Sequence, residues 1–209
     1  MHYFALILVS TITIVSTVFA VKQGWVRGRT NEQDTISVAI PEPMESAFAQ
    51  LKIPLYFEPV ELEISQTKIQ IEQVGLQKDG TLEIPSAWDK AGWYSRSQKP
   101  GQPGNVIIDG HYDTDQGKPA AFWGLKTLLP NDKVVIKDEI GGLFTYKVVE
   151  VFYVDITDPE RAKIFGSQVS DKAELTLVTC GGVWDPSRGT YDKRLVIRAE
   201  LDSAAPAGR

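Results

Sequence analysis

Polar and apolar residues alternate in short segments along most of the chain after residue 53. The clearest segment is Lys-Ile-Gln-Ile-Glu at 68–72, where the character changes at every position, as in a strand with one buried face. Further apolar or alternating segments that we expect to be strands lie at 81–84, 106–108, 133–137, 144–153, 174–180 and 194–201. Many short strands with turn residues between them predict an all-β barrel or sandwich.

Helical signals are few and short. Asp158 is a suitable N-cap, Pro159 suits the first helical position, and Gly166 can close the helix. We expect one or two further helical turns within 119–125 and a short helix within 44–51. The pattern therefore predicts a β-rich domain in which short helices connect some of the strands.

The segment from Tyr3 to Val21 is apolar and contains no charged residue. A helix over this segment is about 28 Å long, which is close to the thickness of the hydrocarbon core of a bilayer. We therefore expect residues 1–21 to be a transmembrane anchor. The run Val18-Phe-Ala20 also fits the cleavage site of a signal peptide, so removal of this segment is the alternative.

The rest of the chain divides into a stalk, a folded domain and a tail. Residues 22–53 are predicted to be a stalk, because polar residues dominate and the prolines at 41 and 43 favour extended backbone. Residues 54–203 are the predicted domain, and residues 204–209 are a C-terminal tail. The positive charges at 22, 27 and 29 favour a cytoplasmic domain, because lysine and arginine are enriched on that side of a membrane.

Composition excludes several classes of function. The chain has 209 residues, a net charge of −5 and a pI of about 5.1. This acidic balance argues against nucleic acid as a partner, because phosphate binding needs a basic surface. Cys180 is the sole cysteine, so an internal disulfide is impossible. One cysteine and two histidines also do not provide the usual ligands of a zinc site.

The sole cysteine lies where a predicted strand meets two glycines. Cys180 is the last residue before this pair, a position at which a side chain can be presented at a rim. A cysteine reacts as its thiolate, which requires a nearby positive charge or base. His111 can supply a base and Arg194 a positive charge. Each of them lies at one end of an apolar segment. The alternative is that Cys180 is a small residue of the core.

These three residues lie in motifs that resemble those of the sortase family. The motifs are Thr176-Leu-Val-Thr-Cys180, Gly110-His111 and Asp192-Lys-Arg194 at the head of the last predicted strand. Sortases are membrane-anchored cysteine transpeptidases that cut a sorting signal and join it to a cell-surface amine. The resemblance covers roughly residues 54 to 203. It implies a closed barrel of about eight strands and no metal or organic cofactor.

The resemblance also implies a role for each residue. Cys180 attacks the peptide carbonyl and forms a thioacyl enzyme, while His111 protonates the leaving amine and then takes a proton from the incoming one. Arg194 stabilises the oxyanion, and Arg198, on the same strand face, is its rival. Thr179, which precedes the nucleophile, is implied to position the substrate near the thiol.

Two neighbouring segments are expected to shape the site. Residues 181–191 are predicted to be a loop that lines the substrate groove, and Trp184 in this loop either contributes to specificity or simply packs. Acids near His111 would favour its charged form, and Asp113 is a candidate to orient it. Asp109 stands where most sortases have a small residue, so the local charge differs from the usual one.

The implied partners are sorting-signal peptides of exported proteins and an amine from a cell-wall precursor or a pilin lysine. The sortase resemblance requires the opposite orientation to the one that the charges at 22, 27 and 29 favour. The predicted location is therefore the cell membrane, with one N-terminal span and the catalytic domain outside the cell. The segments 103–113 and 121–125 resemble the smaller sortase classes D to F. Two alternatives remain: a membrane-tethered cysteine hydrolase that uses water as the acceptor, and a non-catalytic β-barrel binding module.

Overall fold

The computed structural model of the protein describes residues 56–167, 171–205 and 207. The predicted anchor, the predicted stalk and the predicted helix within 44–51 lie outside the described residues. Within the described ranges, no helix combines the length and the apolar character needed to cross a membrane.

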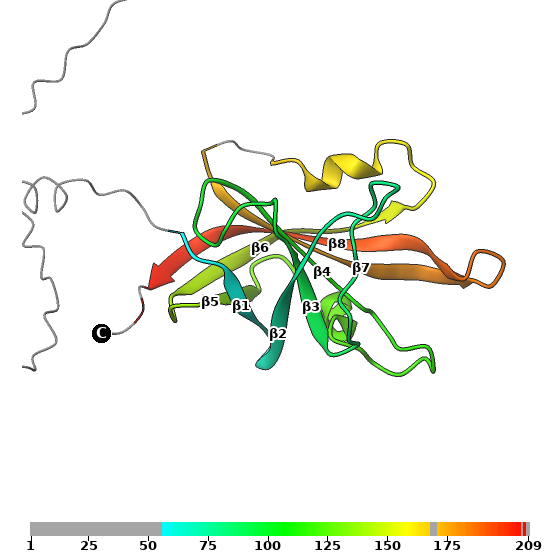
Figure 1. Cartoon of the computed structure of the whole chain (residues 1–209), viewed down its shortest axis with the longest axis horizontal. Helices are drawn as coiled ribbons and strands as arrows, with labels where there is room; N and C mark the ends of the chain where they lie inside the picture. The colour runs from blue at the N-terminus through cyan, green and yellow to red at the C-terminus, as the bar shows by residue number, and fades with distance from the viewer. Residues whose placement is uncertain (1–55, 168–170, 206, 208–209) are drawn as a thin grey trace, which may run out of the picture. The chain divides into compact units, whose positions relative to one another are not determined.

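Eight strands close into a barrel (Figure 1). In chain order they are β1 (Pro59–Ile64), β2 (Thr67–Val74), β3 (Lys90–Tyr94), β4 (Gly104–Gly110), β5 (Lys133–Asp138), β6 (Leu143–Asp155), β7 (Ala173–Asp185) and β8 (Thr190–Ala205). Around the barrel the order is β1-β2-β3-β4-β7-β8-β6-β5. The prediction of an all-β closed barrel is therefore confirmed.

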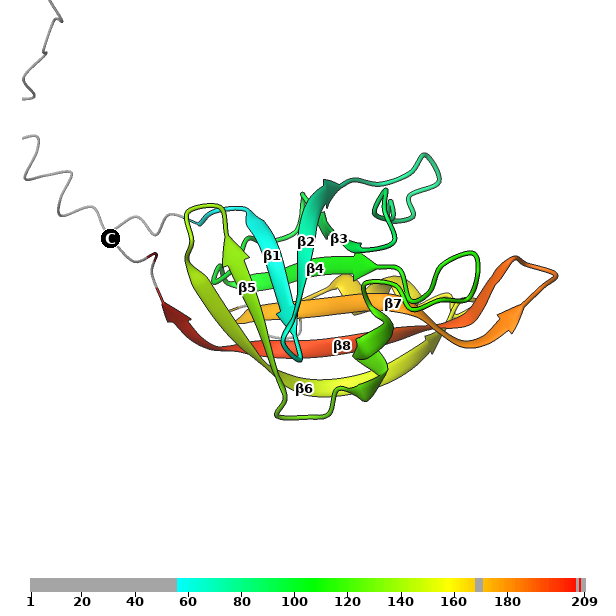
Figure 2. The ribbon, with the colours of Figure 1, turned by 90° about the horizontal axis from the view of Figure 1, so that it is seen from below.

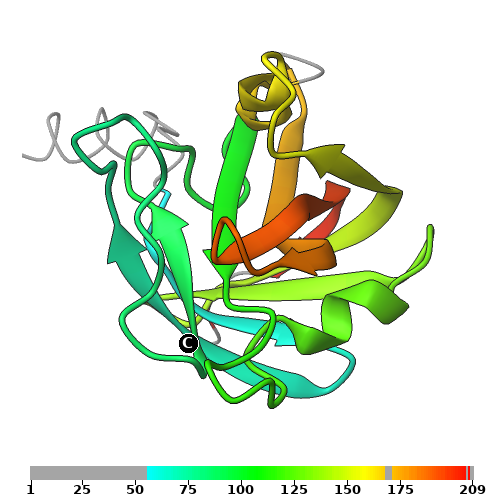
Figure 3. The same cartoon turned by 90° about the vertical axis from the view of Figure 1, so that its right-hand side faces the viewer.

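Two of the pairs of neighbouring strands are parallel. β2 pairs with β3 and β4 pairs with β7 in this way, while the remaining pairs are antiparallel. Parallel neighbours need a long connection, and the chain between β4 and β7 passes through β5 and β6 before it returns. β4 and β7 thus lie side by side although they are far apart in the sequence (Figures 2 and 3).

Most of the predicted strands are present, and the structure adds two. The segment 68–72 lies within β2, and the segments from 106 onwards lie within β4 to β8. β1 and β3 are the additions. In β3, Ala91 and Trp93 are buried in the core while Gly92 between them has no side chain. The sequence therefore shows no clear alternation of polar and apolar residues there.

The predicted strand at 81–84 is wrong. This part of the β2–β3 connection forms only an isolated bridge, between Leu76 and Leu82. The Asp79 carboxylate accepts hydrogen bonds from the Thr81 N–H at 3.0 Å and from its hydroxyl at 2.6 Å, which makes a turn capped by a side chain. Ile84 is 61% exposed, so the apolar residues that suggested a strand do not line the core.

The two helices that the structure describes are short 3-10 helices, η1 (Trp123–Thr127) and η2 (Arg161–Phe165). Asp158 acts partly as predicted, since its carboxylate accepts a hydrogen bond of 2.8 Å from the Glu160 N–H. The helix nevertheless begins only at Arg161 and is not an α-helix. The helical turns expected within 119–125 start at Trp123.

Alternation along β7 and β8 divides their side chains between the two faces of the barrel wall. Leu175 and Leu177 of β7 and Leu195 and Ile197 of β8 are buried inside the barrel with Trp93. The residues between them therefore point to the outer face.

A smaller cluster covers part of this outer face. Val178 and Val196 pack there against Ile164 of η2. The β6–β7 connection, which contains η2, therefore lies over the outside of β7 and β8 (Figure 1). Cys180 follows Val178 by two residues, so its side chain belongs to the same outer face.

Candidate active site

The outer faces of β7 and β8 bring Cys180 and Arg194 together. The two residues are direct partners in the antiparallel register of these strands. Directly opposed residues project from the same face, with Cβ atoms about 4.5–5.5 Å apart. Arg194 does not open its strand as predicted, because β8 already begins at Thr190.

The parallel pair β4 and β7 brings His111 to the same region. The register of the pair extends to residue 109 of β4. One residue further, the Thr179 hydroxyl donates a hydrogen bond of 2.7 Å to the Gly110 carbonyl oxygen. His111 and Cys180 are the next residues on the two chains. The topology therefore gathers His111, Cys180 and Arg194 in one region of the outer surface.

The β2–β3 connection covers the His111 imidazole. His111 Nε2 lies 3.2 Å from the Pro85 carbonyl oxygen, and its ring centroid is 4.3 Å from that of Trp88. Asp113, the acid considered as its orienting partner, instead accepts a hydrogen bond of 2.6 Å from the Tyr191 hydroxyl. Asp113 thus connects the segment after β4 to β8, and a backbone oxygen contacts the imidazole.

The surroundings of Cys180 act on its thiol in opposite directions. The residue is half-buried, and this burial raises the pKa of the Cys180 thiol. The positive charge of Arg194 and a hydrogen bond with Thr190 counteract the rise in the thiol pKa. The charge of Asp113 raises it further, as does the charge of Asp109 whenever that acid is ionised. At neutral pH the resting site therefore holds mainly the thiol, and the thiolate is a minor population.

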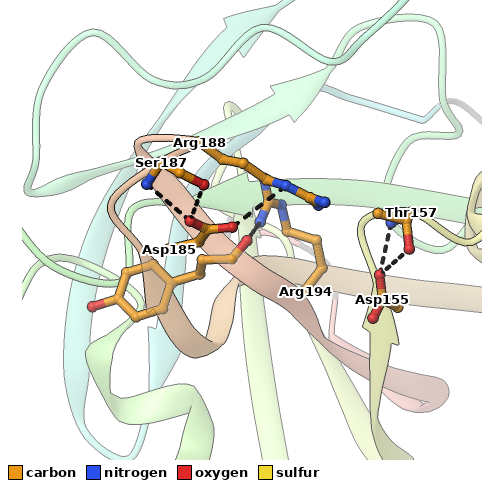
Figure 4. A network of polar contacts seen from close by, with 7 residues as sticks. Asp155, Thr157, Asp185, Ser187, Arg188 and Arg194 are labelled. Carbon is orange, nitrogen blue, oxygen red and sulfur yellow. Dashed lines mark hydrogen bonds and ion pairs between the residues drawn. The ribbon is translucent and has the colours of Figure 1, made fainter.

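The β7–β8 hairpin holds the Arg194 guanidinium in place. Nη1 donates hydrogen bonds to the carbonyl oxygens of Tyr191 at 3.3 Å and Lys193 at 3.1 Å, and Nη2 donates to the Thr190 hydroxyl at 3.4 Å. Figure 4 shows Arg194 on the strand that leaves the turn at Asp185. Because a guanidinium has five N–H donors, donors remain for a substrate oxygen.

Arg198 has different partners. In the register it lies opposite Thr176 instead of Cys180. Its Nη1 donates to the Glu150 carboxylate at 3.2 Å, and its guanidinium carbon lies 4.9 Å from the ring centroid of Phe152. The geometry therefore favours Arg194 over Arg198 as the cation that serves the thiol.

The strand break predicted after Cys180 is wrong, because β7 continues through both glycines. Gly182 has a φ of 83°, and a Cβ there would collide with the Asp192 carboxylate, which accepts a hydrogen bond of 2.7 Å from the Val183 N–H. The glycine permits a bulge, so the two strands extend as a hairpin to a turn at Asp185. The residues expected to form a loop are therefore mostly strand.

Trp184 lies on this hairpin and is 51% exposed. Its ring centroid is 5.4 Å from that of Tyr191, which in turn lies 5.7 Å from Tyr112. Both contacts are edge-to-face, a favourable arrangement for aromatic rings. An aromatic row thus runs from the hairpin to the segment after β4, and it passes the Asp113 carboxylate that binds the Tyr191 hydroxyl.

Several residues of the site are not apparent from the sequence pattern. Thr190 and Tyr191 have only their proximity to Arg194 in the sequence as a signal. Pro85 and Trp88 have none, because they belong to a connection that looks like an ordinary turn region. Only the barrel topology places that connection over His111.

Thr179 is expected to contribute mainly by joining β7 to β4. Replacing Thr179 with valine keeps the shape of this buried side chain but removes its hydrogen bond to the part-buried Gly110 carbonyl oxygen. We expect the free energy of unfolding to fall by about 1–2 kcal/mol in urea titrations. Thr127→Val is the matched control, since its hydroxyl bonds a backbone carbonyl at an exposed position. Equal losses in the two variants would contradict this role.

The comparison with known proteins agrees with this geometry. The family model of the sortase domain matches residues 62–202. The chain therefore belongs to the sortase family, whose members are cysteine transpeptidases. A sequence search among curated proteins found no match.

Solved sortase structures share the fold. Sortase A from Listeria monocytogenes is 19% identical with a TM-score of 0.53, and covers 72% of this chain and 90% of its own. A lid mutant of sortase A from Corynebacterium diphtheriae is 22% identical with a TM-score of 0.54, and covers 79% and 82%. A sortase E variant from Streptomyces avermitilis is 24% identical with a TM-score of 0.51, and covers 74% and 96%. At these identities the likeness shows the fold alone.

Proposed function

We propose that this protein is a sortase in which Cys180 is the nucleophile, His111 is the general acid and base, and Arg194 stabilises the oxyanion. The observation that supports this assignment best is the direct pairing of Cys180 with Arg194 on β7 and β8. It is strengthened by β4, which runs beside β7 and leads directly into His111. The binding-module alternative gives no reason for a thiol, an imidazole and a guanidinium to meet on one face.

The reaction proceeds in two halves. In the minor reactive form the thiol proton of Cys180 has moved to His111. The Cys180 thiolate then attacks the carbonyl carbon of the scissile peptide, and the electron pair of the C=O bond moves to the oxygen, which Arg194 stabilises. The tetrahedral intermediate collapses, the C–N bond breaks, and His111 protonates the leaving amine. An incoming amine then attacks the thioester, gives a proton to His111 and displaces the thiolate. The products are a new amide and the original enzyme.

The proposed substrate is a sorting-signal peptide of an exported protein, and the proposed acceptor is an amine of a cell-wall precursor or a pilin lysine. Thr179 supports the substrate site from inside the wall, since its hydroxyl is bonded to Gly110. Trp184 is exposed on the hairpin beside the nucleophile and is the proposed specificity contact. No metal or organic cofactor enters the reaction as written.

We assign the protein to the smaller classes D to F. The support is the sequence around His111 together with the short connections: the only helices in the described ranges are η1 and η2, each of five residues. We also propose that residues 1–21 anchor the chain in the cell membrane with the domain outside. Protease added to intact cells should then degrade the domain, whereas protection would contradict this location.

The test of the function uses the full-length protein and a panel of quenched sorting-signal peptides, with and without a primary amine. Mass spectrometry of the protein should detect a thioester adduct on Cys180, and mass spectrometry of the products should detect a new amide that forms only with the amine. Such a result would establish transpeptidation and identify the motif. Cleavage that the amine does not alter would favour the hydrolase instead. Failure of every peptide to form an adduct would favour the binding module.

A further inference from the structure

Asp109 is a buried acid that the proposed mechanism does not use. It lies near the end of β4, on the strand face that carries His111 two residues later. Its side chain is only 7% exposed, and among the described residues its fully covered Oδ1 has no hydrogen-bond partner. A carboxylate in this position is costly, and the cost is avoided when the group is protonated.

The neighbouring strand leaves room for this carboxyl group. Gly92 of β3 is the register partner of Asp109. A Cβ at Gly92 would lie 2.6 Å from Oδ1 of Asp109 and 2.7 Å from Cγ1 of Val74. A larger residue at this position would displace the carboxyl group, so the acid and the glycine fit each other sterically.

The charged groups around Asp109 do not neutralise it. On the adjacent strands β3 and β2, Lys90 and Glu72 form an ion pair with each other at 3.0 Å. His111 continues the same face just after β4 ends, and on β7 that face carries Cys180. Within the described ranges, no lysine or arginine forms an ion pair with Asp109. When Asp109 is ionised, its charge acts on the Cys180 thiol.

We propose that Asp109 is a positioning residue of the transpeptidation site, uncharged in the working enzyme and inhibitory to the Cys180 thiolate when it ionises. This inference rests on the proposed role of Cys180 as the nucleophile. Ionised Asp109 limits the formation of the Cys180 thiolate at alkaline pH. The acid and the thiol share one outer face and cannot both carry a negative charge without mutual repulsion.

The direction of the effect follows from the ionisation of both groups. Burial raises the pKa of Asp109 to about 8. Below that pH the group is neutral and adds no charge beside the thiol. Above that pH it is an anion, and its charge raises the pKa of the Cys180 thiol. Higher pH would normally produce more thiolate, and the ionisation of Asp109 opposes this gain in the same pH range.

The test is the rate at which iodoacetamide alkylates the full-length protein at pH 6.5 and pH 9. Because Cys180 is the sole cysteine and only the thiolate reacts, the rate reports on this group alone. Asp109→Asn should match the wild type within about twofold at pH 6.5 and exceed it on the order of fivefold at pH 9. The assay needs no peptide, so its failure is distinct from failure of the proposed function.

Asp115→Asn is the matched control, because it removes an exposed acid from the segment after β4 and should leave both rates unchanged. A mutant-to-wild-type ratio for Asp109→Asn that is the same at both pH values would overturn the proposal, since a purely structural effect has no reason to depend on pH. If that variant fails to fold, the wild type provides the test. Its infrared spectrum should show the C=O band of a protonated carboxyl group at pH 6.5, lost by pH 9. Absence of this band at pH 6.5 would also overturn the proposal.

Discussion

Replacing Cys180 with alanine is expected to lower kcat/KM for cleavage of a sorting-signal peptide by at least about 10³-fold. The reason is that the thiolate forms the covalent bond to the acyl group, and neither Arg194 nor His111 can replace it. The thioester adduct should disappear from the mass spectrum of the protein at the same time. Because Cys180 is half-buried at the outer surface, the free energy of unfolding should change by about 1 kcal/mol or less.

Two comparisons make this result specific. Cys180→Ser keeps the size of the side chain but replaces the thiol with a far weaker acid, so its turnover should also be very low. A serine variant that retained full activity would argue against a thiolate mechanism. Cleavage by Cys180→Ala within tenfold of the wild type would eliminate Cys180 as the nucleophile for the peptide tested, provided that circular dichroism shows both proteins to be folded.

Replacing Arg194 with alanine is the second change with a large expected effect, a loss of about 10²–10³-fold in kcat. The guanidinium lies opposite Cys180, and the hairpin contacts fix its position before the substrate binds. Its charge also lowers the pKa of the Cys180 thiol, so the alanine variant should be alkylated more slowly at neutral pH. Arg194→Lys keeps the charge but loses the planar donor group, so alkylation should recover more than turnover does.

Arg198→Ala is the matched control for the arginine at the site. Arg198 is on the same strand face but pairs with Glu150, which is 54% exposed, and it lies opposite Thr176. Exposed ion pairs contribute about 0–1 kcal/mol to stability, so this variant should keep kcat within about threefold. If Arg198→Ala lost more activity than Arg194→Ala, Arg198 and not Arg194 would have to be assigned as the oxyanion donor.

The correctly predicted strands differ from the missed strand β3 and the wrongly predicted segment 81–84 in what their local sequence shows and in whether a partner strand is available. In part of β2 and of β6, burial follows the alternation visible in the sequence: Ile69 is buried between exposed neighbours, and Tyr146 and Val148 are buried on either side of exposed Lys147. β3 has no such signal, because Gly92 interrupts it and its place depends on pairing with β2 and β4. The segment 81–84 looked like a strand but has no partner strand, and a turn with Asp79 holds it instead. Apolar character alone does not reveal whether a partner is available.

The candidate site shows the same division. Cys180, His111 and Arg194 were identifiable because each is rare or placed at the end of an apolar segment, and because their motifs resemble a known family. Asp109 was visible only as an unusual residue in its motif. Its burial, its missing partner and its fit to Gly92 come from a strand pairing that the local sequence does not encode.

The sequence by itself determined the all-β class of this protein, its family resemblance and the three residues with reactive or charged groups. These depend on residue chemistry and on the period-two pattern, both of which are local properties. The tertiary structure decided that Arg194 and not Arg198 faces the thiol, that Pro85 and Trp88 contact His111, and that the glycines after Cys180 extend a hairpin. Those outcomes depend on strand register and on barrel closure. Both arise from the pairing of segments that are distant in the sequence, so the pairing energy cannot be deduced from either segment alone.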